Sequence, residues 1–383
     1  MVRSMTRTAS SAPRNVDAVA FNEPLLVASI VAVSMAMGLL VPGLAKALAP
    51  LLLPSLFVIV LTSLIPFRSV LLKALLRLER GNLIVVGWLQ GLLPCVVFAL
   101  AHVLGVPDTI LPFVLLSACS GAVFATPTLA TLFGFDRERA ARIMILSTLV
   151  MPVSLCLFVG PLIGLDNVQA FQTFGMRVVV FLIVPAMLVG LLRAGEVLLC
   201  RARARRAAKD MAAEGAQVSS AEAQGTEAHA PAAREADPAA CEVTQAMDHQ
   251  GWFDVQAVRV GMLALAVFAV SIMDGVAEHA ARDPQFIFAL FMGGLTVNLG
   301  MMLATRFALS PLGADVAHTA SIVAMTRNVG LAYAMTAAFF GPTLAEYVAL
   351  CQVPLLIGPL IARLRASRVG STGTPPMAAP VPA

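Results

Sequence analysis

Charged residues are scarce in this sequence. Asp, Glu, Lys and Arg make up 13% of its 383 residues, roughly half the 25% share typical of soluble domains. Hydrophobic residues make up 59%, and the mean hydropathy is +0.86. This balance excludes a soluble domain and indicates an all-α, polytopic membrane protein. The net charge of +4 gives no reason to expect nucleic acid as a partner.

Several chemical motifs are also missing. The six cysteines are scattered, and four of them lie inside apolar runs (Cys95, Cys119, Cys156 and Cys351), so no disulfide framework is indicated. No G-x-x-x-x-G-K motif is present, which excludes ATP as the driver, and no H-E-x-x-H motif or paired intramembrane aspartates indicate an enzyme. We therefore expect no catalytic residues, no bound metal and no cofactor.

What the sequence has instead is long apolar runs. Runs of about 20 residues predict about ten transmembrane helices. They lie near residues 24–41, 47–67, 83–105, 109–133, 140–165, 174–199, 255–277, 285–304, 315–339 and 343–363.

Lysine and arginine predict the orientation of these helices. They gather in the N-terminal tail (1–23), the loops near 68–82 and 134–142, the segment after 200 and the C-terminal tail (366–383). The positive-inside rule then places both termini in the cytoplasm. We expect the chain to lie in the cell (inner) membrane. The basic, acid-poor start is also compatible with an organellar transit peptide.

Residues 200–252 differ from the rest, because they are rich in Ala, Glu and Gln and poor in large apolar residues. We expect a disordered or partly helical cytoplasmic linker there, whose basic start either marks topology or lies along anionic lipid. It separates residues 24–199, which hold the first five-helix repeat and helix six, from helices seven to ten in 253–365. Because five is odd, the second five-helix repeat is expected to be inverted relative to the first.

Two of the predicted spans have polar, small-residue centres. The span near 109–133 contains Ser117-Ala118-Cys119-Ser120-Gly121 and then Thr126-Pro127-Thr128, and the span near 315–339 contains Arg327 at its centre. Proline disfavours helical geometry at the residue before it, so we expect the first span to break just before Pro127. Two interrupted spans in corresponding places are typical of a transporter's binding site.

Specific stretches resemble a known family. They are Cys119-Ser120-Gly121, Ser147-Thr148-Leu149 followed by Pro152, the spaced residues Pro185, Gly190 and Arg193, and Arg327-Asn328-Val329-Gly330-Leu331-Ala332. Together they resemble the bile acid:sodium symporter family, within the wider group of bile acid, arsenite and riboflavin carriers. The resemblance implies a panel of helices one, two, six and seven, a core of the others, interrupted helices four and nine that cross, and alternating access by rocking.

The sequence departs from the family at its sodium ligands. The corresponding positions hold Ala125 and Thr126, then Ala140 and Met144, and then Val323. A hard cation needs several oxygen ligands, so we do not expect the usual sodium sites to work. The family's glutamine in helix nine is Arg327, whose fixed charge would occupy the space of a sodium ion.

Arg327 is also the main candidate for substrate binding. Guanidinium pairs with carboxylate through two parallel hydrogen bonds, so an organic carboxylate or sulfonate is the expected substrate. The other candidates for the substrate site are Asn328, Thr326, Cys119, Ser120, Thr126 and Gln90. A structural ion pair of Arg327 with Asp315 or Asp274 is the alternative, and capping of a half-helix is an equal alternative for Asn328.

The predicted function is secondary transport of an organic anion by alternating access, with the lipid bilayer and the anion as partners. Alternatives are a sodium-coupled symporter, an arsenite-type efflux carrier that uses the Cys119 thiolate, and a membrane sensor that signals through the linker. Coupling by exchange, by protons through His102 or His318, or simple facilitation stays open. Substrate identity and oligomeric state do too.

Overall fold

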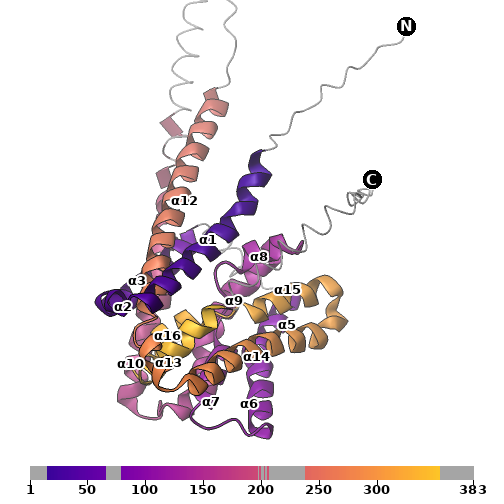
Figure 1. Ribbon diagram of the computed structural model, residues 1–383. Coiled ribbons are helices and arrows are strands. Elements are labelled where there is room, and N and C mark those ends of the chain that lie inside the picture. Colours follow the sequence, from indigo (N-terminus) through magenta and orange to yellow (C-terminus); the bar gives the residue numbers. More distant parts are fainter. Residues whose placement is uncertain are drawn as a thin grey trace, which may run out of the picture.

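The computed structural model of the chain describes residues 15–65, 79–196, 198–199, 202, 205–206 and 238–353. The regular elements in these ranges are all helices, and no strand occurs among them. The all-helical class expected from composition is therefore confirmed. Figure 1 shows α1 (Asn15–Leu40) beside α12 (Pro238–Ser271), with the shorter helices gathered around the far end of α12.

Six helices are long and apolar enough to cross a bilayer. They are Pro42–Leu64 (α2, Pro42–Leu48; η1, Ala49–Leu51; α3, Leu52–Leu64), Arg80–Val103 (α5, Arg80–Gly87; η3, Trp88–Leu92; α6, Leu93–Val103), Arg137–Phe158 (α9), Val168–Glu196 (beginning with α10, Val168–Val178, and η5, Val179–Ile183), Val255–Arg282 (the end of α12, and α13, Val276–Arg282) and Pro284–Ala308 (α14). Large apolar side chains such as Val103, Val153 and Phe307 are exposed on them, as expected of a surface that faces lipid. These features indicate a membrane-embedded protein.

The other predicted spans are shorter or interrupted. The apolar part of α1 covers Ala28–Leu40, and the helix at 343–353 reaches the end of the described residues before its predicted end at 363. Short 3-10 turns follow α9 and α14 (η4, Gly160–Leu162; η6, Ser310–Leu312). The described residues therefore contain six long apolar helices where about ten spans are predicted.

The two segments with polar centres are interrupted, as predicted. The first consists of α7 (Leu111–Cys119) and α8 (Thr126–Leu132), and the second of α15 (Ala314–Met325) and α16 (Val329–Thr336). The first break covers residues 120–125, and α8 resumes at Thr126 with Pro127 in its first turn. Proline is tolerated there because the first turn of a helix has no intrahelical partner for that N–H group.

The helices pack in two groups. The panel group consists of α1, α2, α3 and α12, which pack together. The crossing group consists of α5, α6, α7, α8, α9, α14 and α15. Between them lies α16, which contacts α3, α10 and η5 as well as α7 of the crossing group. Figure 1 shows α16 at this junction, beside α10.

One helix begins earlier than expected. The helical span predicted from residue 255 starts at Pro238 as part of α12, so it extends into the range 200–252 assigned to the linker. Residues 238–250 are rich in Ala, Glu and Gln, which favour helix. Most of the predicted linker, residues 1–14 of the N-terminal tail and the predicted C-terminal tail lie outside the described residues.

Candidate binding site at the crossing of two interrupted helices

The two helix breaks are joined by backbone hydrogen bonds. Val123 N donates to Thr326 O at 2.8 Å, and Asn328 N donates to Gly121 O at 2.7 Å. Ala122 and Arg327 thereby form an isolated antiparallel bridge. Unwound backbone inside a membrane must find partners, and here each break supplies them to the other.

Side chains add a further link at the crossing. The hydroxyl groups of Thr126 and Thr326 lie 2.7 Å apart. The Thr126 hydroxyl also lies 2.5 Å from Val123 O, and the Thr326 hydroxyl lies 2.8 Å from Ile322 O, each about one turn earlier in its own segment. Both threonines are fully buried. Their first role is therefore to hold the crossing together.

Gly121 allows a close approach between the crossing and α9. A Cβ atom at this position would lie 2.9 Å from Thr148 Cα and 2.8 Å from Thr148 Oγ1, distances that real Cβ atoms do not adopt. The absence of a side chain at Gly121 therefore permits a backbone approach that any larger residue would prevent.

Arg327 lies at the centre of the crossing and donates to two backbone carbonyls. Its Nη1 is 2.8 Å from Ser120 O, at the C-terminal end of α7, and its Nη2 is 3.3 Å from Leu89 O. Leu89 belongs to the π-helical turn η3, and such turns disturb the regular helix ladder and are frequent at functional sites. The C-terminal end of a helix is electronegative, so α7 favours the cation.

The guanidinium has no acidic partner among the described residues. Arg327 is 3% exposed, whereas Asp315 and Asp274, the predicted alternatives for an ion pair, are exposed and make no ion pair with it. Its Nε atom is buried without a hydrogen-bond partner in the described part of the chain, as is Oε1 of Gln90. One of these unpartnered atoms belongs to the buried guanidinium itself, and the other belongs to Gln90, whose amide nitrogen shares Ser120 O with Arg327.

The remaining predicted site residues also lie at this crossing. Gln90 Nε2 donates to Ser120 O at 3.1 Å, the same carbonyl that Arg327 uses. Ser120 Oγ donates back to Ser117 O at 2.8 Å, and the buried Cys119 thiol lies in the electrostatic field of Arg327. Asn328 Oδ1 accepts from Leu331 N at 3.0 Å and so caps α16, which agrees with its alternative role. The structure therefore brings all seven predicted residues together.

The positions aligned with sodium ligands offer few oxygen atoms. The side chains of Ala140, Met144 and Val323 are fully buried and apolar, and Ala125 is exposed. Thr126 supplies the one hydroxyl among them, and that group is already bonded to Thr326.

Several polar contacts were not predicted from the sequence. Ser117 Oγ lies 2.7 Å from the buried Tyr347 hydroxyl, and Ser154 Oγ donates to Gln90 O at 2.8 Å. Arg177 Nη1 donates to Ala334 O of α16 at 2.9 Å. These pairs join segments far apart in the chain, so spacing along the sequence contains no signal for them.

A second unpredicted feature is a histidine and glutamate pair, His279 on α13 and Glu346 in the helix at 343–353. The histidines considered from the sequence have aromatic neighbours instead: the ring of His102 lies 5.6 Å from that of Phe98, and the ring of His318 lies 5.3 Å from that of Phe135. No acidic partner of either histidine occurs in the described ranges. Glu346 follows Pro342 near the start of a helix. An acidic residue in this N-terminal position was the one signal in the sequence that could have drawn attention to Glu346.

Comparison with known proteins assigns no family. A scan against models of known protein families finds no match, and a search of the curated proteins finds no similar sequence.

Proposed function

We propose that the chain is a secondary transporter that moves a small organic anion, a carboxylate or a sulfonate, across a membrane by alternating access. Six long apolar helices support a membrane-embedded chain. Two further segments interrupted at a shared crossing support a transporter, because such breaks form substrate sites in carriers.

The observation that carries the anion preference is the state of Arg327. It is 3% exposed, and no carboxylate pairs with it in the described part of the chain. A buried guanidinium is costly unless its charge is compensated. An anionic substrate would supply that compensation when it binds, with Nε of Arg327 as an available donor. Gln90 and the threonine pair would complete the site.

We further propose that anion binding needs no sodium. The guanidinium of Arg327 occupies a place between backbone carbonyls near a helix C-terminus, and such carbonyls coordinate sodium in carriers. A fixed cation in this place leaves no room or need for a mobile one. The resemblance to the bile acid:sodium symporter family supports an architecture of ten helices in two inverted repeats. We propose that this architecture lies in the cell inner membrane, with both termini in the cytoplasm.

The test is ligand-induced thermal stabilisation of the purified protein. Ligands that bind only the folded state raise the melting temperature by mass action. Succinate, benzoate, cholate and taurocholate are compared in sodium chloride and in choline chloride. Wild type is expected to be stabilised by at least one anion in both salts, and Arg327→Met by none.

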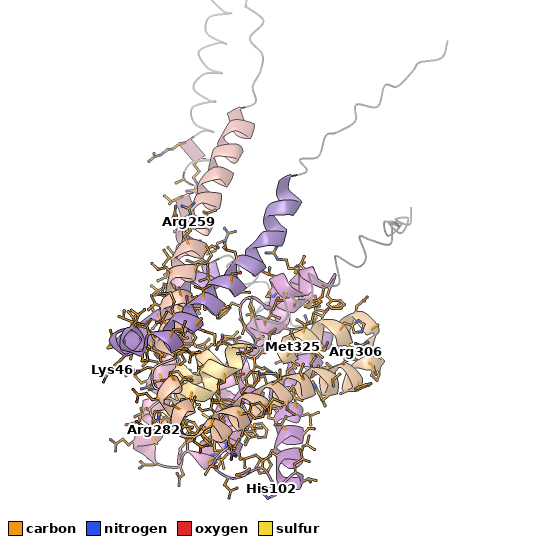
Figure 2. The ribbon with its side chains drawn as sticks, in the orientation of Figure 1. Lys46, His102, Arg259, Arg282, Arg306 and Met325 are labelled. Atoms are coloured by element: carbon orange, nitrogen blue, oxygen red, sulfur yellow. The ribbon has the colours of Figure 1, made fainter. Side chains whose placement is uncertain are left out.

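Arg259→Met is the matched control. Arg259 is an exposed arginine on α12, well away from the labelled Met325 of the crossing in Figure 2, and its removal should leave the anion effect unchanged. Stabilisation that requires sodium would support the sodium-coupled symporter instead. Equal stabilisation of wild type and Arg327→Met would contradict the assignment of the site.

A further inference from the structure

Glu346 is a buried carboxylate. It is 5% exposed. Among the described residues, Glu346 and Arg327 are the two buried side chains of the Asp, Glu, Lys and Arg types. His279 Nδ1 lies 2.9 Å from Glu346 Oε1 and 2.8 Å from Oε2. An ionised carboxylate only accepts hydrogen bonds, so Nδ1 carries the hydrogen and donates to both oxygens. Glu346 also lies in the first turn of its helix, where a negative charge is favoured.

The two members of the pair differ in their access to water. The side chain of His279 is 35% exposed and that of Glu346 is 7% exposed. The imidazole ring stacks on Phe286, with ring centroids 5.4 Å apart, which fixes its orientation. A proton from water therefore reaches the imidazole first, and imidazole is the side chain that gains and loses protons most readily near neutral pH.

Other charged groups near the pair are already engaged or exposed. On α13, Glu278 pairs with Arg282 at 3.5 Å, and both are exposed. At the start of α14, Asp283 Oδ1 accepts from Phe286 N at 3.0 Å, and Asp274, in the turn before α13, is exposed.

Two further neighbours of the pair contribute no charge among the described residues. The described side chains of α1, which packs on α13, include no charged residue. The residue after Glu346 is Tyr347, whose hydroxyl is bonded to Ser117. His279 and Glu346 therefore respond mainly to each other.

The pair lies between the crossing group and an element that is joined to the panel group. The short helix α13 follows α12 of the panel group after a turn at 272–275, and it packs on α14 of the crossing group and, to a smaller extent, on α1. The helix that carries Glu346 is tied to α7 of the crossing group through Tyr347 and Ser117, at 2.7 Å. A movement of α12 and α1 relative to the crossing group would pull on α13, and so would strain the contact between His279 and Glu346.

We infer that His279 and Glu346 form a proton-binding site that couples the rocking of the two helix groups to proton movement. This inference rests on the proposed transport function. A proton taken from water by His279 Nε2 changes the donor from a neutral imidazole to an imidazolium, so the bond to the Glu346 carboxylate gains the attraction between opposite charges. Proton binding thus favours the joined arrangement, and release of the proton to water on the side of the membrane opposite to its uptake favours the opening of that arrangement.

The first experiment needs no transported anion. Hydrogen exchange is measured on wild type for peptides that cover 276–282 and 343–349, at about pH 5.5 and about pH 8, after correction for the intrinsic rate. Protection of both peptides is expected to be about fivefold higher at the lower pH, and His279→Gln and Glu346→Gln should abolish this difference. His102→Gln, a histidine without an acidic partner among the described residues, should retain it. The same pH dependence in wild type and His279→Gln would overturn the inference.

The second experiment measures transport in proteoliposomes with succinate and taurocholate, which do not cross lipid as uncharged acids. Wild type should accumulate one of these anions when a pH gradient is imposed. His279→Gln and Glu346→Gln should lose this accumulation yet exchange internal for external anion at equal pH, and the control Glu278→Gln should behave as wild type. Gln keeps the size of Glu346 and still accepts from Nδ1, so folding is preserved.

The two proposals fail in different ways. Variants that accumulate the anion as wild type does would overturn the coupling role, while leaving transport intact. A wild type that exchanges neither anion counts against the proposed function, and hydrogen exchange would still decide whether the pair binds a proton.

Discussion

Replacing Arg327 with methionine separates a functional arginine from a structural one. Methionine has a similar length and no charge, so it fills the space with little change of packing. The substitution removes the hydrogen bonds to Ser120 O and Leu89 O. Ser120 O keeps the bond from Gln90 at 3.1 Å, whereas Leu89 O loses the partner that the guanidinium supplies.

The expected change in the free energy of unfolding follows from two opposed contributions. An unsatisfied buried carbonyl costs about 1–3 kcal/mol, and loss of the favourable interaction with the C-terminal end of α7 costs up to about 2 kcal/mol. Burying an uncompensated guanidinium costs several kcal/mol, and this cost disappears in the variant. Arg327→Met is therefore expected to lie within about 2 kcal/mol of wild type, whereas breaking a buried ion pair would destabilise by about 3–5 kcal/mol.

The assay is reversible unfolding in mixed micelles with increasing sodium dodecyl sulfate, with Arg259→Met as the control for loss of an exposed arginine. Near-equal stability together with loss of anion-induced stabilisation would identify Arg327 as a binding residue retained for function. A loss of more than about 3 kcal/mol would refute this reasoning, because it would mean that Arg327 compensates a charge that the structure does not place beside it.

Other changes test the geometry of the crossing. Gly121→Ala should destabilise the protein by about 1–3 kcal/mol, because the added Cβ meets Thr148 of α9. Gly87→Ala, with open space around its added Cβ, should be neutral or should stabilise the protein by up to about 1 kcal/mol. The melting temperatures of both variants check this. Tyr347→Phe leaves Ser117 Oγ without its partner and should cost about 1–3 kcal/mol, seen in the same unfolding assay. Thr326→Val removes one hydroxyl bond of the crossing and should cost about 0.5–1.5 kcal/mol, with faster hydrogen exchange in residues 120–126; unchanged exchange there would contradict the role of the threonine pair.

The sequence predicted those features that depend on local chemistry. Apolar runs gave the positions of the long helices because the bilayer demands length and hydrophobicity together. Pro127 predicted the break in the first interrupted segment. Arg327 predicted the break in the second one, because a continuous apolar helix in a bilayer rarely holds a charged residue at its centre. Both signals lie within a few residues of the feature they predict.

Features that depend on long-range packing were not predictable in this way. The partners of Arg327 are backbone carbonyls of Ser120 and Leu89, and a carbonyl has no signature in the sequence because every residue carries one. His279 and Glu346 are 67 residues apart, and nothing in their local sequence relates them. The start of α12 at Pro238 agrees with the expectation of a partly helical linker. Its position could not be predicted from apolar residues, because helix propensity and continuation of a long helix are what extend α12 there.

The contacts of α16 indicate where movement between the two groups would occur. On its crossing side the chain is held by directional bonds, at 2.7 Å from Asn328 N and 2.8 Å to Thr326 O, and buried bonds of this kind are costly to break. On its panel side Gly330 lies against Leu56 and Phe268: a Cβ atom added at Gly330 would lie 3.4 Å from Leu56 Cδ2 and 3.5 Å from Phe268 Cζ. Such apolar contacts are exchanged for lipid or for one another at little cost.

It follows that α16 and the crossing would move as one body, and that the sliding surface would lie between α16 and the panel group. The hydrogen bond from Arg177 to Ala334 O crosses the face of α16 next to this surface. The α10 segment continues into η5, which packs on α3 of the panel group, so this bond would break if the panel group moved relative to α16. In the proposed transport cycle, Arg327 would keep its place at the crossing.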